Sequence, residues 1–143
     1  MRQTKNLLDT QVSTPVKLAT LWASLMSCFI YCDYFGLYTK GAVLEMNDGI
    51  MGPLGVATPL VMLAVSAMMA IPSLMIAGSV ILKASTSRGL NLIVPPFYIL
   101  IMIATSIGAE PFYMFFAVVE VLLLIAITFH AWKWPSEIMV NSQ

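Results

Sequence analysis

Hydrophobic residues along the chain fall into four long runs that are separated by short polar segments. The runs cover about residues 16–38, 56–82, 90–107 and 112–132. A helix needs about 20 mainly apolar residues to cross the roughly 30 Å hydrocarbon core of a bilayer, and each run approaches or exceeds that length. The pattern therefore predicts an all-α integral membrane protein, a bundle of four transmembrane helices.

The four runs form one predicted domain, residues 15–135, with polar tails at 1–14 and 136–143. Residues 39–55 combine charged, apolar and glycine residues, which predicts a loop or a short helix lying on the bilayer surface. Pro72 removes a backbone hydrogen bond inside the second run, and the carbonyl that it frees needs a partner from Ser73 or from a neighbouring helix. The polar residues 83–89 predict a loop, and Pro95–Pro96 predict distorted first turns in the third helix.

The composition agrees with lipid as the solvent of this chain. Hydrophobic residues make up 59% of it and charged residues only 10%, whereas soluble domains carry about 25% charged residues. The formal net charge is zero. A broad basic surface is therefore excluded, and nucleic acid is not an expected partner.

The basic residues are distributed unevenly between the two ends of the predicted helices. Six fall at one end: Arg2, Lys5, Lys17, Lys83, Arg88 and Lys133. Lys40 falls at the other end, together with Glu45, Asp48 and Glu110. Because cytoplasmic loops carry the excess of Lys and Arg, we expect both termini to be cytoplasmic.

Two carboxyl groups lie inside the predicted transmembrane runs. Asp33 precedes the end of the first run by five residues, and Glu120 follows the start of the fourth by eight. At 1.5 Å per residue, these positions are about 8 Å and about 12 Å deep from the same side of the bilayer. Ionisable groups at such depth are costly and should face the bundle interior. If the first and fourth helices are neighbours, the two carboxyls meet or share a cavity.

Tyr31, Tyr34 and Tyr113 are candidate partners of these carboxyls. Removal from water and a second carboxylate both favour the neutral form, so at least one carboxyl is expected to be protonated at neutral pH. Two interpretations stay open. Asp33, Glu120 and the three tyrosines form a ligand-binding or proton-exchange site, or a protonated carboxyl forms a hydrogen bond between helices and stabilises the bundle.

The remaining reactive side chains are expected to be structural. Cys28 and Cys32 share one face of the first helix, where a disulfide would be strained, so small buried residues are expected and a redox pair is the alternative. One histidine and two thiols do not give the spacing of a metal site. No catalytic residue, metal or cofactor is predicted, and whether the protein is an enzyme stays open.

Several stretches resemble one family of short bacterial membrane proteins. They are "KLATLWASLM" and "YCDYFGLY" in the first run, "SRGLNLI" at 87–93 and "PFYMFFAVVEVLLLIAITFHAWKWP" at 111–135. Members of this uncharacterised family, loosely labelled DoxX-like, are bacterial membrane proteins with four helices. The resemblance therefore implies a four-helix fold and a location in the bacterial inner membrane. The resemblance covers about residues 16–135, includes Asp33 and Glu120 in its pattern and transfers no activity. Related sequences often carry an acid where this chain has Ala70, which implies an altered site if that acid belongs to it.

Three functions follow from these observations. The first is a protein that binds or carries a small cation or a lipid-like ligand at an intramembrane carboxylate site, with membrane lipid and a second copy as expected partners. The second is a structural or accessory subunit of a larger membrane assembly, docked through small residues such as Ala64, Ala67, Ala70 and Gly78. The third is a DoxX-like quinone or thiol redox protein.

Overall fold

The computed structural model describes residues 11–135, and four long helices dominate it. These are α1 (Thr14–Gly36), α3 (Pro59–Ile81), α4 (Ala84–Ser106) and α5 (Pro111–Trp132). The short helix α2 (Ala42–Asn47) and the 3-10 helix η1 (Gly52–Leu54) lie between α1 and α3. Each long helix is long and apolar enough to cross a membrane, as the four hydrophobic runs predict.

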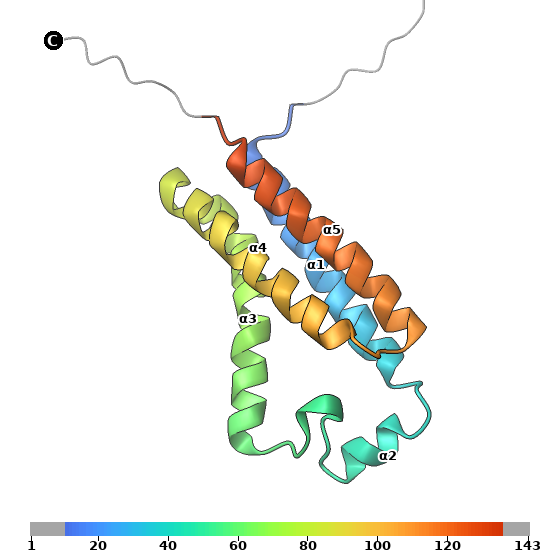
Figure 1. Cartoon of the computed structure of the whole chain (residues 1–143). Helices are drawn as coiled ribbons and strands as arrows, with labels where there is room; N and C mark the ends of the chain where they lie inside the picture. Colours follow the sequence, from blue (N-terminus) through green and yellow to red (C-terminus); the bar gives the residue numbers. More distant parts are fainter. Residues whose placement is uncertain (1–10, 136–143) are drawn as a thin grey trace, which may run out of the picture.

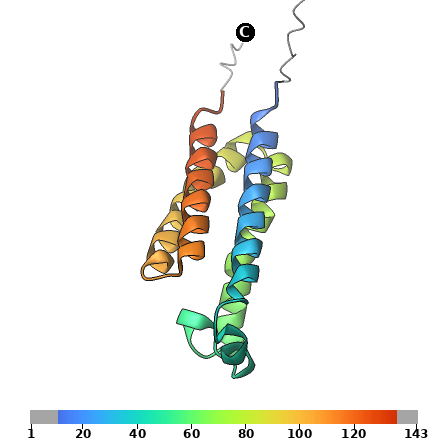
Figure 2. The same ribbon diagram turned by 90° about the vertical axis from the view of Figure 1, so that its right-hand side faces the viewer.

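The long helices form an antiparallel bundle in two layers. Figure 2 shows α1 beside α3 in one layer and α5 beside α4 in the other. α1 packs extensively against both α3 and α5, and α5 packs extensively against α4, whereas α3 and α4 contact each other much less. Figure 1 shows α3 and α4 diverging from their shared turn towards the end of the bundle that carries α2. The expectation that the helices bearing Asp33 and Glu120 are neighbours is therefore confirmed.

All described basic residues except Lys40 lie at the end of the bundle where both described chain ends lie (Figure 1). Lys17 is in the first turn of α1, Lys83 in the turn between α3 and α4, and Lys133 directly after α5. Lys40 follows α1 at the opposite end. Arg2 and Lys5 lie outside the described residues. We call the end with the described chain ends the basic end, and the other end the α2 end.

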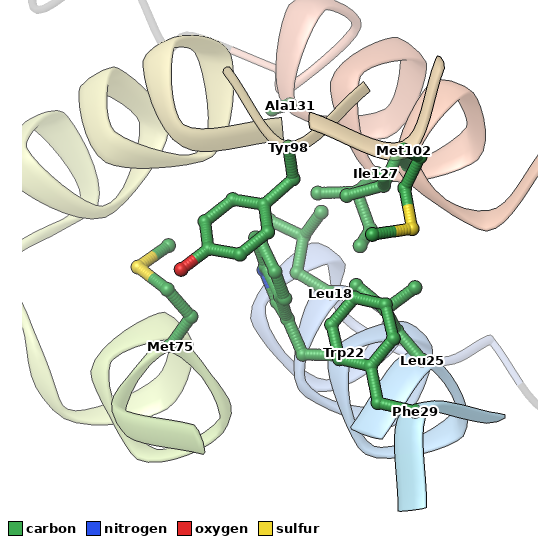
Figure 3. Packing of buried hydrophobic residues seen from close by; sticks show 10 residues of the cluster. Leu18, Trp22, Leu25, Phe29, Met75, Tyr98, Met102, Ile127 and Ala131 are labelled. Carbon is green, nitrogen blue, oxygen red and sulfur yellow. The ribbon is translucent and has the colours of Figure 1, made fainter. Parts of the chain in front are cut away.

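The core forms where the apolar face of α1 meets the other three helices. Leucine and aromatic side chains recur on α1 at the three- and four-residue spacing that places them on one helix face. The buried residues of this face are Leu18, Trp22, Leu25, Phe29 and Cys32. In Figure 3 the Tyr98 ring of α4 lies between Met75 of α3 and the aromatic side chains of α1. This contact holds α3 and α4 together, although they diverge beyond it.

Pro72 inside α3 is compensated by a side chain from α4. Pro72 has no N–H, so the carbonyl of Met68, four residues earlier, lacks its helical donor. The hydroxyl of Tyr98 donates a hydrogen bond to this carbonyl. The sequence predicted that Ser73 or a neighbouring helix would supply the donor. In the structure the donor comes from the neighbouring helix α4. The Ser73 hydroxyl donates to the Met69 carbonyl instead, at 3.1 Å.

A buried polar network connects α1, α3 and α4 nearer the basic end. Trp22 Nε1 donates to Asn91 Oδ1 at 2.7 Å. Asn91 Nδ2 donates to the Ser87 carbonyl at 2.8 Å and to Ser79 Oγ at 3.3 Å. Since all four residues are buried, these bonds replace the water that their polar atoms would otherwise need.

The helix limits differ from the sequence prediction mainly at the start of α4. This helix begins at Ala84 rather than near residue 90, so the predicted loop 83–89 is almost entirely helical. Pro95 and Pro96 therefore lie in the middle of α4 and not in its first turns. The segment between α1 and α3 contains the short helix that was one of two predicted alternatives.

Candidate functional site

Glu120 lies on the face of α5 that packs into the bundle. Its side chain is only 3% exposed, and it belongs to a buried stripe at three- and four-residue spacing. Oε1 of Glu120 is buried and accepts no hydrogen bond. An ionised carboxylate in such surroundings costs several kcal/mol unless another group compensates its charge. The position predicted from the sequence as the deepest carboxyl is therefore a buried acid with an unsatisfied oxygen.

The groups around Glu120 come mainly from the last turns of α1. Cys28, Cys32 and Asp33 of α1, with Tyr113 of α5, lie close enough to interact with Glu120 electrostatically. Cys32 is buried and Cys28 half-buried, and both thiols are free. The cluster thus brings two carboxyls and two thiols together at the contact between α1 and α5. It lies nearer the α2 end than the Trp22–Asn91 network does.

Asp33 occupies a more open position than Glu120. It is exposed, and it follows Met26 by seven residues on the same face of α1. The Met26 sulfur accepts a hydrogen bond from Ser73 Oγ of α3 at 3.7 Å, so this face of α1 is directed towards α3. The two carboxyls therefore lie on different sides of α1: Glu120 lies at the contact with α5, and Asp33 lies on the face directed towards α3. Glu120 is enclosed at the contact between α1 and α5, and Asp33 is exposed.

The three candidate tyrosines are not equivalent. Tyr113 is half-buried near the cluster, and its hydroxyl bonds to Thr105 Oγ1 of α4 at 3.0 Å. Tyr31 and Tyr34 are 58% and 48% exposed, and the Tyr34 hydroxyl pairs with that of Tyr38 at 3.0 Å. Among the five predicted site residues, Asp33 and Tyr113 thus lie near Glu120. Tyr31 and Tyr34 lie on the outer surface of α1.

Two apolar hollows lie between α4 and α5, and neither includes Asp33 or Glu120 in its lining, although Ala117 and Val121 of the larger one flank Glu120 along α5. One, of about 530 Å³, is lined by residues that include Met102, Ser106, Ala117 and Val121. The other, of about 430 Å³, lies nearer the basic end and is lined by residues that include Pro96, Ile125 and Trp132. Neither hollow has a charged side chain in its lining. Both are open, apolar hollows, which do not suit a charged ligand.

The polar residues that the sequence interpretation overlooked are structural. Arg88 Nε and Nη2 donate to the carbonyls of Ala131 and Trp132 at 3.2 and 3.3 Å and so cap the C-terminus of α5. Asn91 is enclosed by the polar network described above. The available signal was an amide inside an apolar helix, because a buried amide in lipid needs partners. These residues fix the bundle at the basic end and leave Glu120 as the buried acid without a complete set of partners.

Within residues 11–135, no group of three or more His, Cys, Asp or Glu side chains has an arrangement that could hold a metal ion. The carboxyl–thiol cluster therefore lacks the ligand geometry of a metal centre. Its central group is a buried carboxylic acid with an unpartnered oxygen, a type of group that can exchange a proton or pair with a cation.

Comparisons with curated proteins and with solved structures found no match. A family model, by contrast, matches almost the whole chain, including every residue of the site. The motifs in α1, α4 and α5 predicted an uncharacterised family, and this is confirmed. The model covers residues 8–141, and the chain belongs to this family of unknown function, DUF6326.

Proposed function

We propose that the protein spans a membrane with four helices, both termini in the cytoplasm, and binds or carries a small cation at Glu120. On this proposal Glu120 is protonated when the site is empty and releases its proton when the cation binds. Asp33 provides the accessible carboxylate that a cation meets first. The uneven distribution of basic residues supports the orientation, since Lys17, Lys83 and Lys133 lie at the same end.

One observation carries this proposal: Glu120 is 3% exposed, and its Oε1 has no hydrogen-bond donor. A carboxyl that only joins helices would be expected to have its oxygens paired, because an unpaired buried acceptor costs about 1–3 kcal/mol. The Trp22–Asn91 network illustrates such pairing in the same bundle. An acid left unsatisfied in a well-packed bundle has the character of a binding group whose partner arrives from outside.

The experiment measures proton release from the purified full chain in nanodiscs. Cations are added to weakly buffered protein, and the released protons are followed with a pH indicator. Wild type is compared with Glu120→Gln, and Glu110→Gln is the matched control because Glu110 is exposed at the start of α5. We expect wild type and Glu110→Gln to release about one proton per bound cation and Glu120→Gln to release none. Equal release from all three proteins would contradict the proposal.

A specific observation also favours the accessory-subunit function as a second candidate. Ala64, Ala67 and Ala70 of α3 are exposed. Only 11% of the residues in the most apolar stretch of α3 are buried in the bundle. Small exposed residues allow close approach of another transmembrane helix. If this function is the correct one, Ala67→Leu will abolish co-purification with a larger assembly, while Glu120→Gln will have no effect on it.

The DoxX-like label, its quinone chemistry and the bacterial inner membrane stay predictions from the resemblance, and thiol redox chemistry stays the alternative predicted from Cys28 and Cys32. Cys28 and Cys32 lie beside Glu120, so a redox role would place both thiols at the same cluster. A Cys28→Ala, Cys32→Ala double variant separates the two roles. Cation-dependent proton release persists in this variant if Glu120 is the binding group.

A further inference from the structure

Several aromatic rings lie on α1 and α5 between Glu120 and the α2 end. Phe116 precedes Glu120 by one turn of α5, so the two side chains lie on the same side of that helix. The Phe116 ring packs against Phe35 of α1, with ring centroids 6.2 Å apart and an interplanar angle of 30°. Phe35 follows Cys32 by three residues. The two rings therefore cover the contact between α1 and α5 directly beyond the carboxyl–thiol cluster, towards the α2 end.

This ring pair belongs to a larger set of rings in contact, which we call the aromatic cluster. Its members are Tyr31, Tyr34, Phe35, Tyr38, Phe115 and Phe116. Successive ring centroids are 5.6–6.5 Å apart. All members except the half-buried Phe116 are exposed. The cluster therefore presents ring faces to the surroundings and extends without interruption to the turn that precedes Glu120.

An interfacial belt of aromatic residues does not account for this arrangement. Belts are formed mainly by Trp and Tyr, whose polar groups remain at the headgroup level. Here three of the six rings are phenylalanines with no polar group, and two of them lie within about one turn of the buried acid. Within residues 11–135, the observed cation–π contact is Lys133 over Phe129, 4.4 Å from the ring centroid, at the basic end. The rings of the aromatic cluster are thus free to receive a cation from outside the protein.

The surroundings of Glu120 suit one class of cation better than another. An inorganic ion such as Ca²⁺ or Mg²⁺ needs about six or more oxygen ligands at fixed distances. The described residues provide two carboxyls, two thiols and aromatic rings instead, with no metal-binding arrangement. An alkylated ammonium ion is attracted to ring faces and needs a single counter-charge.

We propose that the ligand of Glu120 is an organic ammonium ion with alkyl substituents, recognised by the aromatic cluster and then paired with the Glu120 carboxylate. This inference rests on the proposed function, because it specifies the ligand of the same site. Phe35 and Phe116 provide the ring faces nearest the carboxylate, and the exposed tyrosines of α1 provide further ring faces near Asp33, which the cation meets first. The apolar substituents surround the positive charge in place of a tightly bound water shell. An alkylated ammonium ion therefore has less bound water to lose on binding than a metal ion has.

The test compares two probes on the full chain in nanodiscs: tetramethylammonium chloride and sodium chloride at equal ionic strength. Binding is measured calorimetrically, and proton release is recorded in the same titration. The variants are Phe35→Leu, Phe116→Leu and Phe115→Leu. Phe129→Leu is the matched control, since Phe129 is also exposed on α5 but lies outside the aromatic cluster. Because Phe115 is 66% exposed, its replacement leaves the bundle intact even if the other two variants fold poorly.

We expect tetramethylammonium to bind and release a proton. We also expect binding about five- to tenfold weaker in each cluster variant and unchanged in Phe129→Leu, in proportion to the loss of a cation–π contact. Proton release with sodium but not with tetramethylammonium would overturn the ligand class and leave the proposed function standing. Release with neither cation would overturn the proposed function itself. Equal affinity of the cluster variants and the control would show that the rings have no role in recognition.

Discussion

The hydrogen bond between Tyr98 and the Met68 carbonyl allows a quantitative test of the fold. Tyr98→Phe removes only the hydroxyl and keeps the ring, which is 1% exposed and stacks on Phe29 with centroids 6.4 Å apart. The Met68 carbonyl then has no donor, because Pro72 cannot supply one. The substitution therefore isolates the contribution of a single interhelical hydrogen bond.

The expected cost follows from the surroundings of the carbonyl. An unpaired buried acceptor costs about 1–3 kcal/mol in protein interiors. Interhelical hydrogen bonds in membrane proteins average about 0.6 kcal/mol, with a maximum near 1.7 kcal/mol. Since α3 and α4 diverge beyond this contact (Figure 1), some relaxation is available. We expect Tyr98→Phe to lower the free energy of unfolding by about 1–1.5 kcal/mol.

A second substitution shows whether the reasoning is correct. Pro72→Ala restores a backbone N–H at position 72, which donates to the Met68 carbonyl in an ordinary α-helical bond. In that background Tyr98→Phe should cost less than about 0.5 kcal/mol, because the carbonyl keeps a donor. The four proteins form a double-mutant cycle, measured by reversible unfolding in mixed detergent micelles with tryptophan fluorescence. Equal costs in the two backgrounds would refute the assignment of Tyr98 as the compensating donor.

Three further predictions concern the polar groups of the bundle. Asn91→Leu should destabilise the protein by about 1–3 kcal/mol, because it leaves Trp22 Nε1 without an acceptor, and Trp22→Phe in the same chain should recover part of the loss in unfolding assays. Arg88→Met should accelerate amide hydrogen exchange in the last turn of α5 by severalfold, since that turn loses a cap of about 1 kcal/mol, while exchange in α3 should not change. Glu120→Leu should raise the free energy of unfolding by about 1–2 kcal/mol, because an apolar side chain replaces a polar group without a full set of partners. It should also abolish cation binding. A loss of stability would indicate that Glu120 joins the helices.

The apolar runs predicted the helices because crossing a bilayer requires a length and a composition that a sequence displays directly. The start of α4 was not predictable in this way. Residues 84–89 are polar, yet they continue the helix and place Ser87 and Arg88 against neighbouring helices. Hydropathy describes the surroundings of a segment, and it does not determine where its backbone hydrogen bonds begin.

The candidate site was predictable as far as depth and proximity. Counting residues placed Asp33 and Glu120 at similar levels, and the contact between α1 and α5 brings them together. The direction of each side chain required the structure. Tyr31 and Tyr34 carry polar groups at the right depth, but their positions on α1 turn them to the surface. The ring contact between Phe35 and Phe116 depends on how two helices pack, which neither sequence segment specifies alone.

The state of the Glu120 carboxyl during binding tests the central claim most directly. Infrared difference spectra of wild type and Glu120→Gln in nanodiscs assign the carbonyl band of the protonated acid, and tetramethylammonium is then added to saturation. We predict a protonated carboxyl band in the empty protein that is absent from the variant and converts to the carboxylate form when the cation binds. A band that persists unchanged with and without cations across the pH range would contradict the account and identify Glu120 as a structural acid.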